Sequence, residues 1–205
     1  MTPIRNVVFD VGTVLVRWDP EAIVRAAFDL PEDRVAARRQ VLFADTDIWR
    51  ALNRGEYTQP EAMAAYVEAG LLTGPEVRQF FTAIYASLAP LDATADLMRR
   101  LADRGYRLFA LTDNVHEIVE HLSGTHDWWE LFEGAVVSAH VGVLKPDPRI
   151  YRHLLDSHGL NPAETVFFDD VAANVDGACA VGIRGLLFTD ALQAEHSLRA
   201  LGVTD

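Results

Sequence analysis

Short apolar segments alternate with segments of helical periodicity, and this alternation is the feature that most constrains the fold. The apolar segments are rich in β-branched and aromatic residues, as is typical of parallel strands covered on both faces. Four are clear, at residues 6–9, 107–111, 165–168 and 185–188, and a weaker one spans 135–138. Helical patterns occupy 94–104, 115–122, 148–158 and 173–181. The order predicts an α/β fold with an open, parallel, Rossmann-like sheet flanked by helices.

Residues 19–87 interrupt the alternation. They show helical patterns throughout and no strand pattern, with helix starts expected at Pro20, Pro31, Pro60 and Pro75. We therefore expect a small all-helical cap domain at 19–87, inserted after the first strand, and a catalytic core made of 1–18 and 88–205. Because open α/β sheets bind ligands at the carboxyl ends of their strands, such an insertion is well placed to cover a site. A packing appendage without chemistry is the alternative.

The charge of the chain limits its partners. It has 205 residues, of which 30 are acidic and 18 are Lys or Arg, so the formal net charge is −12. Nucleic acids and anionic membranes bind basic surfaces, so we expect neither, and predict a small diffusible ligand instead. A single Cys, no basic-then-apolar leader before Val7 and no apolar run of membrane-spanning length predict a cytoplasmic protein. No feature indicates the number of subunits.

Three of the clear strands run directly into polar residues. Asp10 follows the first, Thr112-Asp113-Asn114 ends the second, and Asp169-Asp170 follows the third. Carboxylates at the ends of buried strands repel one another unless a cation lies among them, and Mg²⁺ prefers such oxygen ligands. Any one of these residues could instead be a helix cap or a turn residue. Three such strand ends in one chain favour a magnesium site.

Two further residues stand out beside these carboxylates. Lys145 is the only Lys in the chain and precedes Pro146. A lone Lys is usually a solvated surface charge, but this setting favours a functional role. Asn174, four residues after Asp170, could orient Lys145 or an acidic ligand, or could cap the next helix.

Four segments of the chain look like the four motifs of the haloacid dehalogenase-like hydrolase superfamily. They occur in the family's order and span nearly the whole chain. The segments are 7–15 (VVFDVGTVL), 111–114 (LTDN), 142–148 (GVLKPDP) and 167–170 (FFDD) followed by Asn174. Within the superfamily the chain is similar to bacterial sugar phosphatases of the glucose-1-phosphate phosphatase type.

The resemblance implies a Mg²⁺-dependent phosphatase acting on small phosphorylated metabolites, with sugar phosphates, especially sugar-1-phosphates, favoured. Asp10 resembles the nucleophile that forms an aspartyl-phosphate. Thr112, with the backbone N–H of Asp113, resembles the phosphate-binding residue, and Lys145 would pair with nucleophile and phosphate. The metal ligands implied are Asp10, the backbone carbonyl of Gly12, Asp169 and Asp170. Asn114 and Asn174 would support these groups.

Gly12 departs from the pattern of most phosphatases in the superfamily, which carry at this position an Asp that acts as general acid and base. Loss of such a group typically removes a factor of about 10² to 10⁴, so we expect slow turnover or substrates with good leaving groups, such as a sugar anomeric oxygen. A cap residue could supply the acid instead, and the candidates are Asp45, Asp47, Glu56 and Tyr57. Candidate substrate contacts in the cap are Trp49, Arg50, Arg54 and Glu56, although Arg50 and Arg54 could be a solvated helix face.

Two alternatives remain from the sequence. Metal-free haloacid dehalogenases also use an Asp nucleophile, but they carry Ser and Asn where Asp169 and Asp170 stand here. A binding or regulatory member that has lost turnover would explain Gly12, whereas the intact Asp10, Lys145, Asp169 and Asp170 argue against it.

Overall fold

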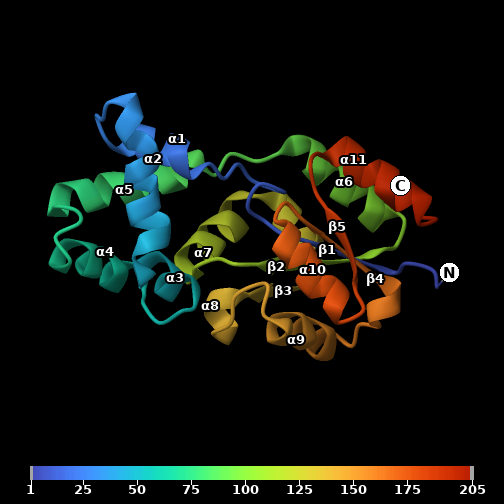
Figure 1. The fold of residues 1–205 in the computed structure, drawn as a ribbon. Helices are drawn as coiled ribbons and strands as arrows, with labels where there is room; N and C mark the ends of the chain where they lie inside the picture. The colour runs from blue at the N-terminus through green and yellow to red at the C-terminus, as the bar shows by residue number, and fades with distance from the viewer. Residues whose placement is uncertain (1, 204–205) are drawn as a thin grey trace.

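The computed structural model describes residues 2–203. Five parallel strands form one sheet in the order β3-β2-β1-β4-β5 (Figure 1). The strands are β1 (Asn6–Phe9), β2 (Arg107–Thr112), β3 (Gly134–Val137), β4 (Thr165–Asp169) and β5 (Arg184–Leu187). The predicted open parallel sheet is therefore confirmed, with strand ends within one residue of those expected.

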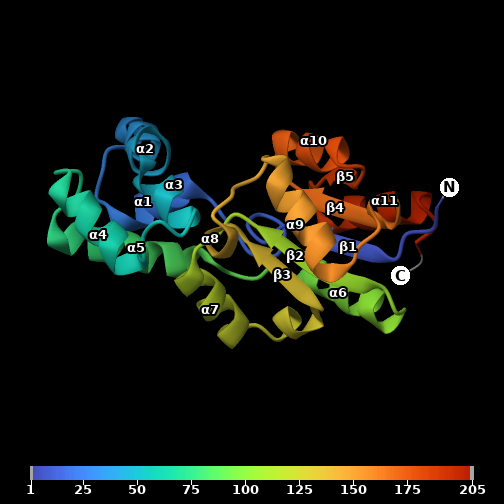
Figure 2. The ribbon, with the colours of Figure 1, turned by 90° about the horizontal axis from the view of Figure 1, so that it is seen from below.

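Helices cover both faces of the sheet (Figure 2). Side chains that alternate along β1 point to opposite faces, so Val7 and Phe9 belong to one hydrophobic core and Val8 to the other. The first core is completed by α6 (Asp92–Asp103), α7 (His116–Thr125) and α11 (Ala191–Ala200), and the second by α9 (Pro148–His158) and α10 (Ala172–Ala180). Short elements connect these helices and strands: η2 (Asp127–Leu131), α8 (Ser138–Val141) and η3 (Pro162–Glu164).

The all-helical insertion follows β1 and lies beyond one end of the sheet, on the left in Figure 1. It contains α1 (Pro20–Ala27), α2 (Glu32–Gln40), the π-helical turn η1 (Val41–Asp45), α3 (Asp47–Asn53), α4 (Gln59–Glu68) and α5 (Gly74–Ser87). The expected starts near four prolines match α1, α2, α4 and α5. The pattern missed α3, which has no proline at its start and follows a π-helical turn without a break in the chain.

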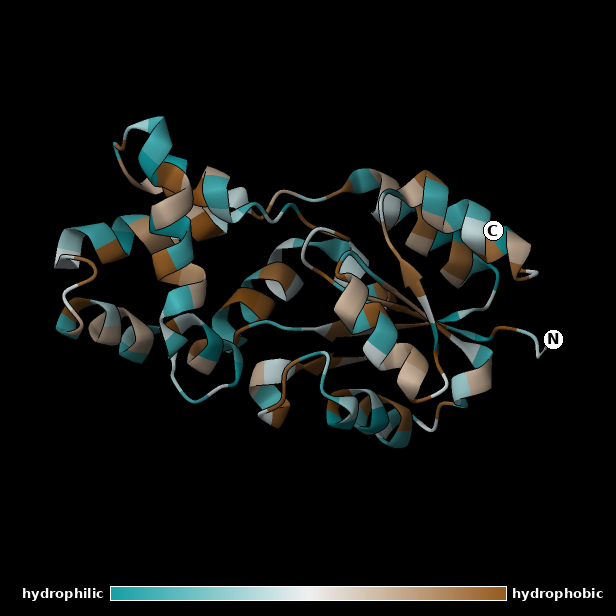
Figure 3. Ribbon diagram, viewed as in Figure 1, coloured by the Kyte–Doolittle hydropathy of each residue, from teal (hydrophilic) through white to brown (hydrophobic). Residues whose placement is uncertain are grey.

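Local signals explain where several helices begin. The Asp19 carboxylate accepts hydrogen bonds from the N–H groups of Glu21 and Ala22, both at 3.0 Å, which caps α1. Thr73 and Glu76 form a reciprocal capping box at the start of α5. Figure 3 shows the result on the larger scale: hydrophilic and hydrophobic residues alternate around most helices, as expected for helices with one face against a core.

The strand register aligns the ends that carry polar residues. Phe9 of β1 pairs with Phe168 of β4 and with Ala110 of β2. Asp10 therefore emerges beside Asp169, at the same edge as the end of β2. The helical insertion lies over this edge (Figures 1 and 2). Among residues 2–203, no helix combines the length and apolar character needed to cross a membrane.

Candidate active site

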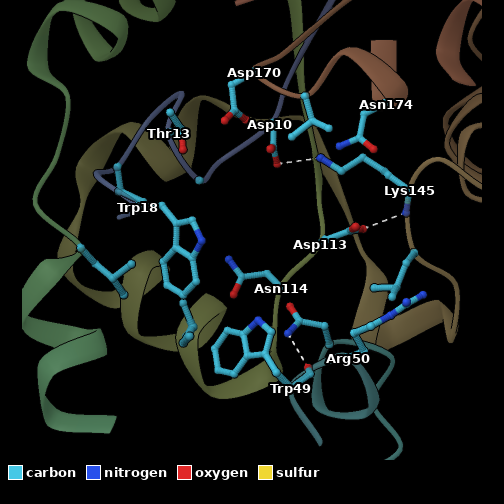
Figure 4. A pocket seen from close by; sticks show the side chains of 17 residues that line it. Asp10, Thr13, Trp18, Trp49, Arg50, Asp113, Asn114, Lys145, Asp170 and Asn174 are labelled. Atoms are coloured by element: carbon cyan, nitrogen blue, oxygen red, sulfur yellow. Dashed lines mark hydrogen bonds and ion pairs between the residues drawn. The ribbon is translucent and has the colours of Figure 1, made fainter. Parts of the chain in front are cut away.

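A cavity of about 370 Å³ lies at the carboxyl edge of the sheet, between the strand ends and the helical insertion (Figure 4). Its size suits a small-molecule ligand. Both parts of the chain contribute to its wall. The lining residues are Asp10, Gly12, Thr13, Val16, Trp18, Trp49, Arg50, Asn53, Leu88, Asp113, Asn114, Ile118, Leu144, Lys145, Asp170, Val171 and Asn174.

The charged centre of the cavity is formed by Asp10, Lys145 and Asp169. The Lys145 ammonium lies 2.9 Å from Oδ1 of Asp10 and 2.7 Å from Oδ2 of Asp169, and it also donates to the Leu111 carbonyl at 3.1 Å. Its side chain is almost fully buried, with 1% exposed. A buried ammonium requires such partners. The sole Lys of the chain is therefore a buried partner of Asp10 and not a surface charge.

Asp169 is completely buried and has no free acceptor capacity. Its Oδ1 accepts from the Val171 N–H at 2.8 Å and from the Asn174 amide at 3.0 Å, while Oδ2 accepts from Lys145 and, at 3.1 Å, from the same amide. A carboxylate offers about four lone-pair positions, and these contacts use them. Asn174 therefore orients an acidic group. The N-cap position of α10 belongs to Val171.

Burial and charge shift the pKa values in this cluster. Burial raises the pKa of the Asp10 carboxyl to about 7; the Lys145 ammonium opposes this rise and repulsion from Asp169 adds to it. Burial, followed by repulsion from Asp169, also raises the pKa of Asp170. Burial alone lowers the pKa of Lys145, but attraction to Asp10, Asp169 and Asp113 outweighs it and the net shift is upward. The site is an acidic cluster that one buried cation only partly neutralises.

Three of these carboxylates could hold a metal ion. One oxygen from each of Asp10, Asp169 and Asp170 lies within 4.8 Å of the other two. An all-oxygen set of carboxylates suits a hard cation such as Mg²⁺. Asp170 is the most accessible of the three, whereas Asp169 is fully engaged by its hydrogen bonds. Direct coordination by Asp10 and Asp170, with Asp169 behind them, fits this arrangement best.

Gly12 and Thr13 form the turn that follows the nucleophile candidate. The left-handed residue of this turn is Thr13, with φ of 62°, and not Gly12. A β-carbon on Gly12 would make only ordinary contacts with the Trp18 side chain, at 3.6 and 3.7 Å. The backbone does not require glycine at position 12, so this position lacks a carboxylate for a reason other than strain.

The loop after β2 is held by hydrogen bonds. Asp113 lines the cavity and accepts from the Lys145 backbone N–H at 3.0 Å, whereas Thr112 is buried behind it and does not line the cavity. The Ser138 hydroxyl accepts from the Asn114 N–H at 2.9 Å and donates to the Asn53 carbonyl at 2.6 Å. Ser138 thus connects the strand-end loop to α3 of the insertion.

The insertion contributes an aromatic wall. Trp49 of α3 stacks on Trp18, with ring centroids 5.7 Å apart and planes at 17°, and Phe43 packs against both edge-to-face. Figure 4 shows the two indoles on one side of the cavity and Arg50 on the side of Lys145 and Asp113. The sequence predicted Trp49 and Arg50 at the site, and both line the cavity.

The structure does not bring Arg54 and Glu56 to the cavity. Arg54 instead forms ion pairs with Asp47 and Glu56 at 2.6 and 2.5 Å, on the outer side of α3. The hydrogen bonds from Arg54 lower the pKa values of both carboxyl groups, which makes them poor proton donors. Asp45, which accepts from Gln40, and Tyr57 also lie outside the lining residues. None of the four expected cap acids is therefore placed to protonate a leaving group.

Sequence reasoning missed Trp18, Asn53 and Ser138. Trp18 lies just before the insertion, and a Trp directly before a domain junction is the signal that could have marked it. Asn53 and Ser138 carry no sequence signal, because their roles depend on α3 docking against α8. This docking is close: a β-carbon on Gly55 would lie 2.1 Å from the Ala139 carbonyl oxygen.

Comparisons with known proteins agree with this geometry. A sesquiterpene phosphatase of Aspergillus oryzae is 29% identical over 98% of this chain and 97% of its own length. The fold is similar to that of a HAD family enzyme of Bacteroides thetaiotaomicron, with a TM-score of 0.80, 21% identity and coverage of 97% of this chain and 100% of that chain. It is also similar to the L-2-haloacid dehalogenase of Xanthobacter autotrophicus, with a TM-score of 0.64, 21% identity and coverage of 95% and 82%.

The family model for haloacid dehalogenase-like hydrolases matches residues 4–182, which include every motif residue described above. The match extends across the inserted helices as well as the sheet. This chain belongs to the haloacid dehalogenase-like hydrolase family.

Proposed function

We propose that this hydrolase is a Mg²⁺-dependent phosphatase that transfers the phosphoryl group of a small organic phosphate to Asp10 and then to water. The observation that carries the proposal is the placement of Asp10 at the base of an open cavity, 2.9 Å from the buried Lys145 ammonium and next to two further carboxylates. A phosphoryl group in line with Asp10 would meet both the cation and the metal-ligand set.

Each residue has a distinct part in this proposal. Asp10 attacks phosphorus through one carboxylate oxygen. Lys145 neutralises charge on Asp10 and on the phosphoryl oxygens, and Asp169 with Asn174 holds the ammonium in place. Thr112 and the N–H of Asp113 bind a phosphoryl oxygen from the end of β2.

The metal ligands in the proposal are Asp10, the Gly12 carbonyl and Asp170, with Asp169 acting directly or through water. When bound, Mg²⁺ would offset the negative charge of the carboxylates and of the phosphoryl group. The related enzyme of Bacteroides thetaiotaomicron has been crystallised with magnesium and inorganic phosphate, which supports this assignment. Two adjacent carboxylates also favour a phosphatase over a metal-free dehalogenase.

The cavity favours a leaving group with an apolar surface. Val16, Trp18, Trp49, Leu88 and Ile118 face it from the side of the insertion. The nearby amides have few atoms free for hydroxyl groups, since Asn53 donates to the Trp49 carbonyl and Asn114 accepts from the Val115 N–H. Because a relative over nearly its full length is a sesquiterpene phosphatase, we propose isoprenoid phosphates as the preferred substrates.

Sugar-1-phosphates are the second candidate. The anomeric oxygen is a better leaving group than an ordinary alkoxide, which suits a site with Gly12 in place of a general acid. An indole face such as that of Trp49 also supports stacking of a sugar ring.

The test is phosphate release from a panel with Mg²⁺: farnesyl phosphate, glucose-1-phosphate, glucose-6-phosphate, glycerol phosphate and p-nitrophenyl phosphate. We expect the highest kcat/KM for farnesyl phosphate among the alkyl esters, and a loss of that preference in Trp49→Leu. Trp129→Leu is the matched control, because Trp129 lies in η2, outside the cavity. Absence of Mg²⁺-dependent release from every substrate would contradict the phosphatase assignment, and a preference for glucose-1-phosphate would favour the second candidate.

We also propose that residues 19–87 act as a cap domain over a core of 1–18 and 88–205. Two contacts between these parts support it: the Ser138 hydroxyl with the Asn53 carbonyl, and the Glu117 carboxylate with the N–H of Gln59 at 2.8 Å. A cytoplasmic location and the absence of nucleic acid and membrane partners remain predictions from composition.

A further inference from the structure

The cavity lacks an obvious proton donor for a leaving group. Its ionisable lining residues are Asp10, Arg50, Asp113, Lys145 and Asp170. Three of these belong to the nucleophile, its ammonium partner and the metal-ligand set. Asp113 accepts a hydrogen bond from the Lys145 N–H, and both this bond and the charges of Lys145 and Arg50 favour its ionised form, although burial raises its pKa. A substrate that expels a weakly basic group would need no donor.

Arg50 is a cation in this cavity without an assigned partner. Within residues 2–203 it forms no hydrogen bond or ion pair, whereas Arg54, one turn further along α3, is paired with Asp47 and Glu56. Figure 4 shows Arg50 reaching from α3 along the side of the cavity that carries Asp113 and Lys145. A guanidinium group binds phosphate with paired N–H donors, so Arg50 is suited to a second anionic group on the ligand.

From these two observations together, and on the basis of the proposed phosphatase function, we infer that the preferred substrate is an organic diphosphate, cleaved at its terminal phosphate. The leaving group is then itself a phosphate, which Arg50 binds, while the organic tail lies against Trp18 and Trp49. One chemical class thus accounts for the absence of a carboxylate at Gly12, the unpaired guanidinium and the aromatic wall.

The reaction needs no proton at the bond that breaks. An Asp10 oxygen attacks the terminal phosphorus, and the bridging oxygen departs with the bonding electron pair as a terminal oxygen of the organic monophosphate. Water then attacks phosphorus in the aspartyl-phosphate, the bond to the Asp10 oxygen breaks, and Asp10 regains its carboxylate. Both protons of that water leave on dihydrogen phosphate. The monophosphate product would have to expel an alkoxide in a second round, so it accumulates.

The test compares farnesyl diphosphate with farnesyl phosphate, using the whole chain loaded with Mg²⁺ and p-nitrophenyl phosphate as the reference. We expect kcat/KM for the diphosphate to exceed that for the monophosphate by about 10²-fold or more, and farnesyl phosphate to appear with one equivalent of inorganic phosphate. Equal use of the two farnesyl substrates, or a preference for an acyl phosphate such as acetyl phosphate, would overturn the inference.

Substitution of Arg50 tests the binding of the leaving phosphate. In Arg50→Gln, the ratio of kcat/KM for farnesyl diphosphate to that for p-nitrophenyl phosphate is expected to fall about 10-fold, whereas Arg54→Gln should leave the ratio unchanged. An unchanged ratio in Arg50→Gln contradicts the inference. So does a selective loss of monophosphate turnover in Asp113→Asn that worsens as the leaving group becomes more basic, because Asp113 would then be the missing acid.

The two proposals fail in different ways. If Mg²⁺-dependent, Asp10-dependent hydrolysis of p-nitrophenyl phosphate is present without a preference for diphosphates, the phosphatase function stands and the diphosphate inference falls. If no phosphate ester or anhydride is hydrolysed, both fall.

Discussion

The Lys145 ammonium lies 2.9 Å from Oδ1 of Asp10, and both side chains are almost completely withdrawn from water. The same ammonium is 2.7 Å from Asp169, so one buried positive charge serves two buried negative charges. This excess of negative charge raises the pKa of Asp10 and prepares the site for a further cation. Both the activity and the pH dependence of stability should therefore respond to changes at this pair.

Asp10→Asn is expected to reduce turnover by about 10³-fold or more while leaving the fold intact, because an amide has nearly the same shape but cannot attack phosphorus. The measurement is kcat with p-nitrophenyl phosphate, together with the far-UV circular dichroism spectrum. Retention of a tenth of the wild-type activity would rule out the covalent role of Asp10.

The stability of the metal-free protein should depend on the charge of Asp10. Because its folded-state pKa, about 7, lies above the ordinary value of 3.8, the folded state binds this proton more tightly than the unfolded state does. The associated stability is fully present below about pH 3.8 and is lost as the pH rises through about 7. Asp10→Asn removes this loss, so its Tm relative to wild type should rise between pH 4 and pH 8 in the presence of a chelator. A Tm difference that does not change with pH would contradict the raised pKa.

Removal of Mg²⁺ should abolish activity, and Mg²⁺ but not Ca²⁺ should restore it. Calcium takes more ligands in a looser shell, which suits in-line transfer poorly. The assay is phosphate release after treatment with excess chelator and readdition of each ion. Asp170→Asn, which removes the most accessible carboxylate of the set, should raise the Mg²⁺ concentration needed for half-maximal activity. Full activity in the chelator would remove the metal from the mechanism.

Gly12→Asp should increase turnover of substrates with basic leaving groups, such as glycerol phosphate, by at least about 10-fold. The structure has room for the new side chain, since its β-carbon would touch Trp18 only at 3.6 Å or more. In wild type, kcat/KM should fall steeply as the pKa of the leaving group rises, and the slope should be shallower in Gly12→Asp. Gly12→Asn is the matched control and should keep the steep slope. A flat wild-type series would show that another group supplies the proton.

Ser138→Ala is expected to destabilise the protein by about 1–3 kcal/mol, because it leaves the buried Asn114 N–H and Asn53 carbonyl without their shared partner. Chemical denaturation of the metal-free protein measures this difference. Ser157→Ala, at an exposed serine of α9, is the control and should change the free energy of unfolding by less than about 0.5 kcal/mol. Equal effects from the two substitutions would show that the Ser138 bridge contributes nothing.

The sequence by itself determined the sheet, its polar edge and the family. Buried parallel strands are short apolar runs whose pattern is local, and a residue that follows such a run must emerge at the carboxyl edge. The amino-acid order alone therefore places Asp10, Asp113 and Asp169 together, and the unusual status of Lys145 is visible from composition.

Only the tertiary structure decided which residues of the helical insertion reach that edge. Arg50 and Arg54 are one turn apart on α3 and look equivalent in sequence, yet Arg50 enters the cavity and Arg54 pairs with Asp47 and Glu56. The difference depends on how α3 docks on α8 through Gly55 and Ser138, which are contacts between residues far apart in the chain. Local periodicity determines that a helix has two faces, but only long-range packing selects the face that meets the substrate.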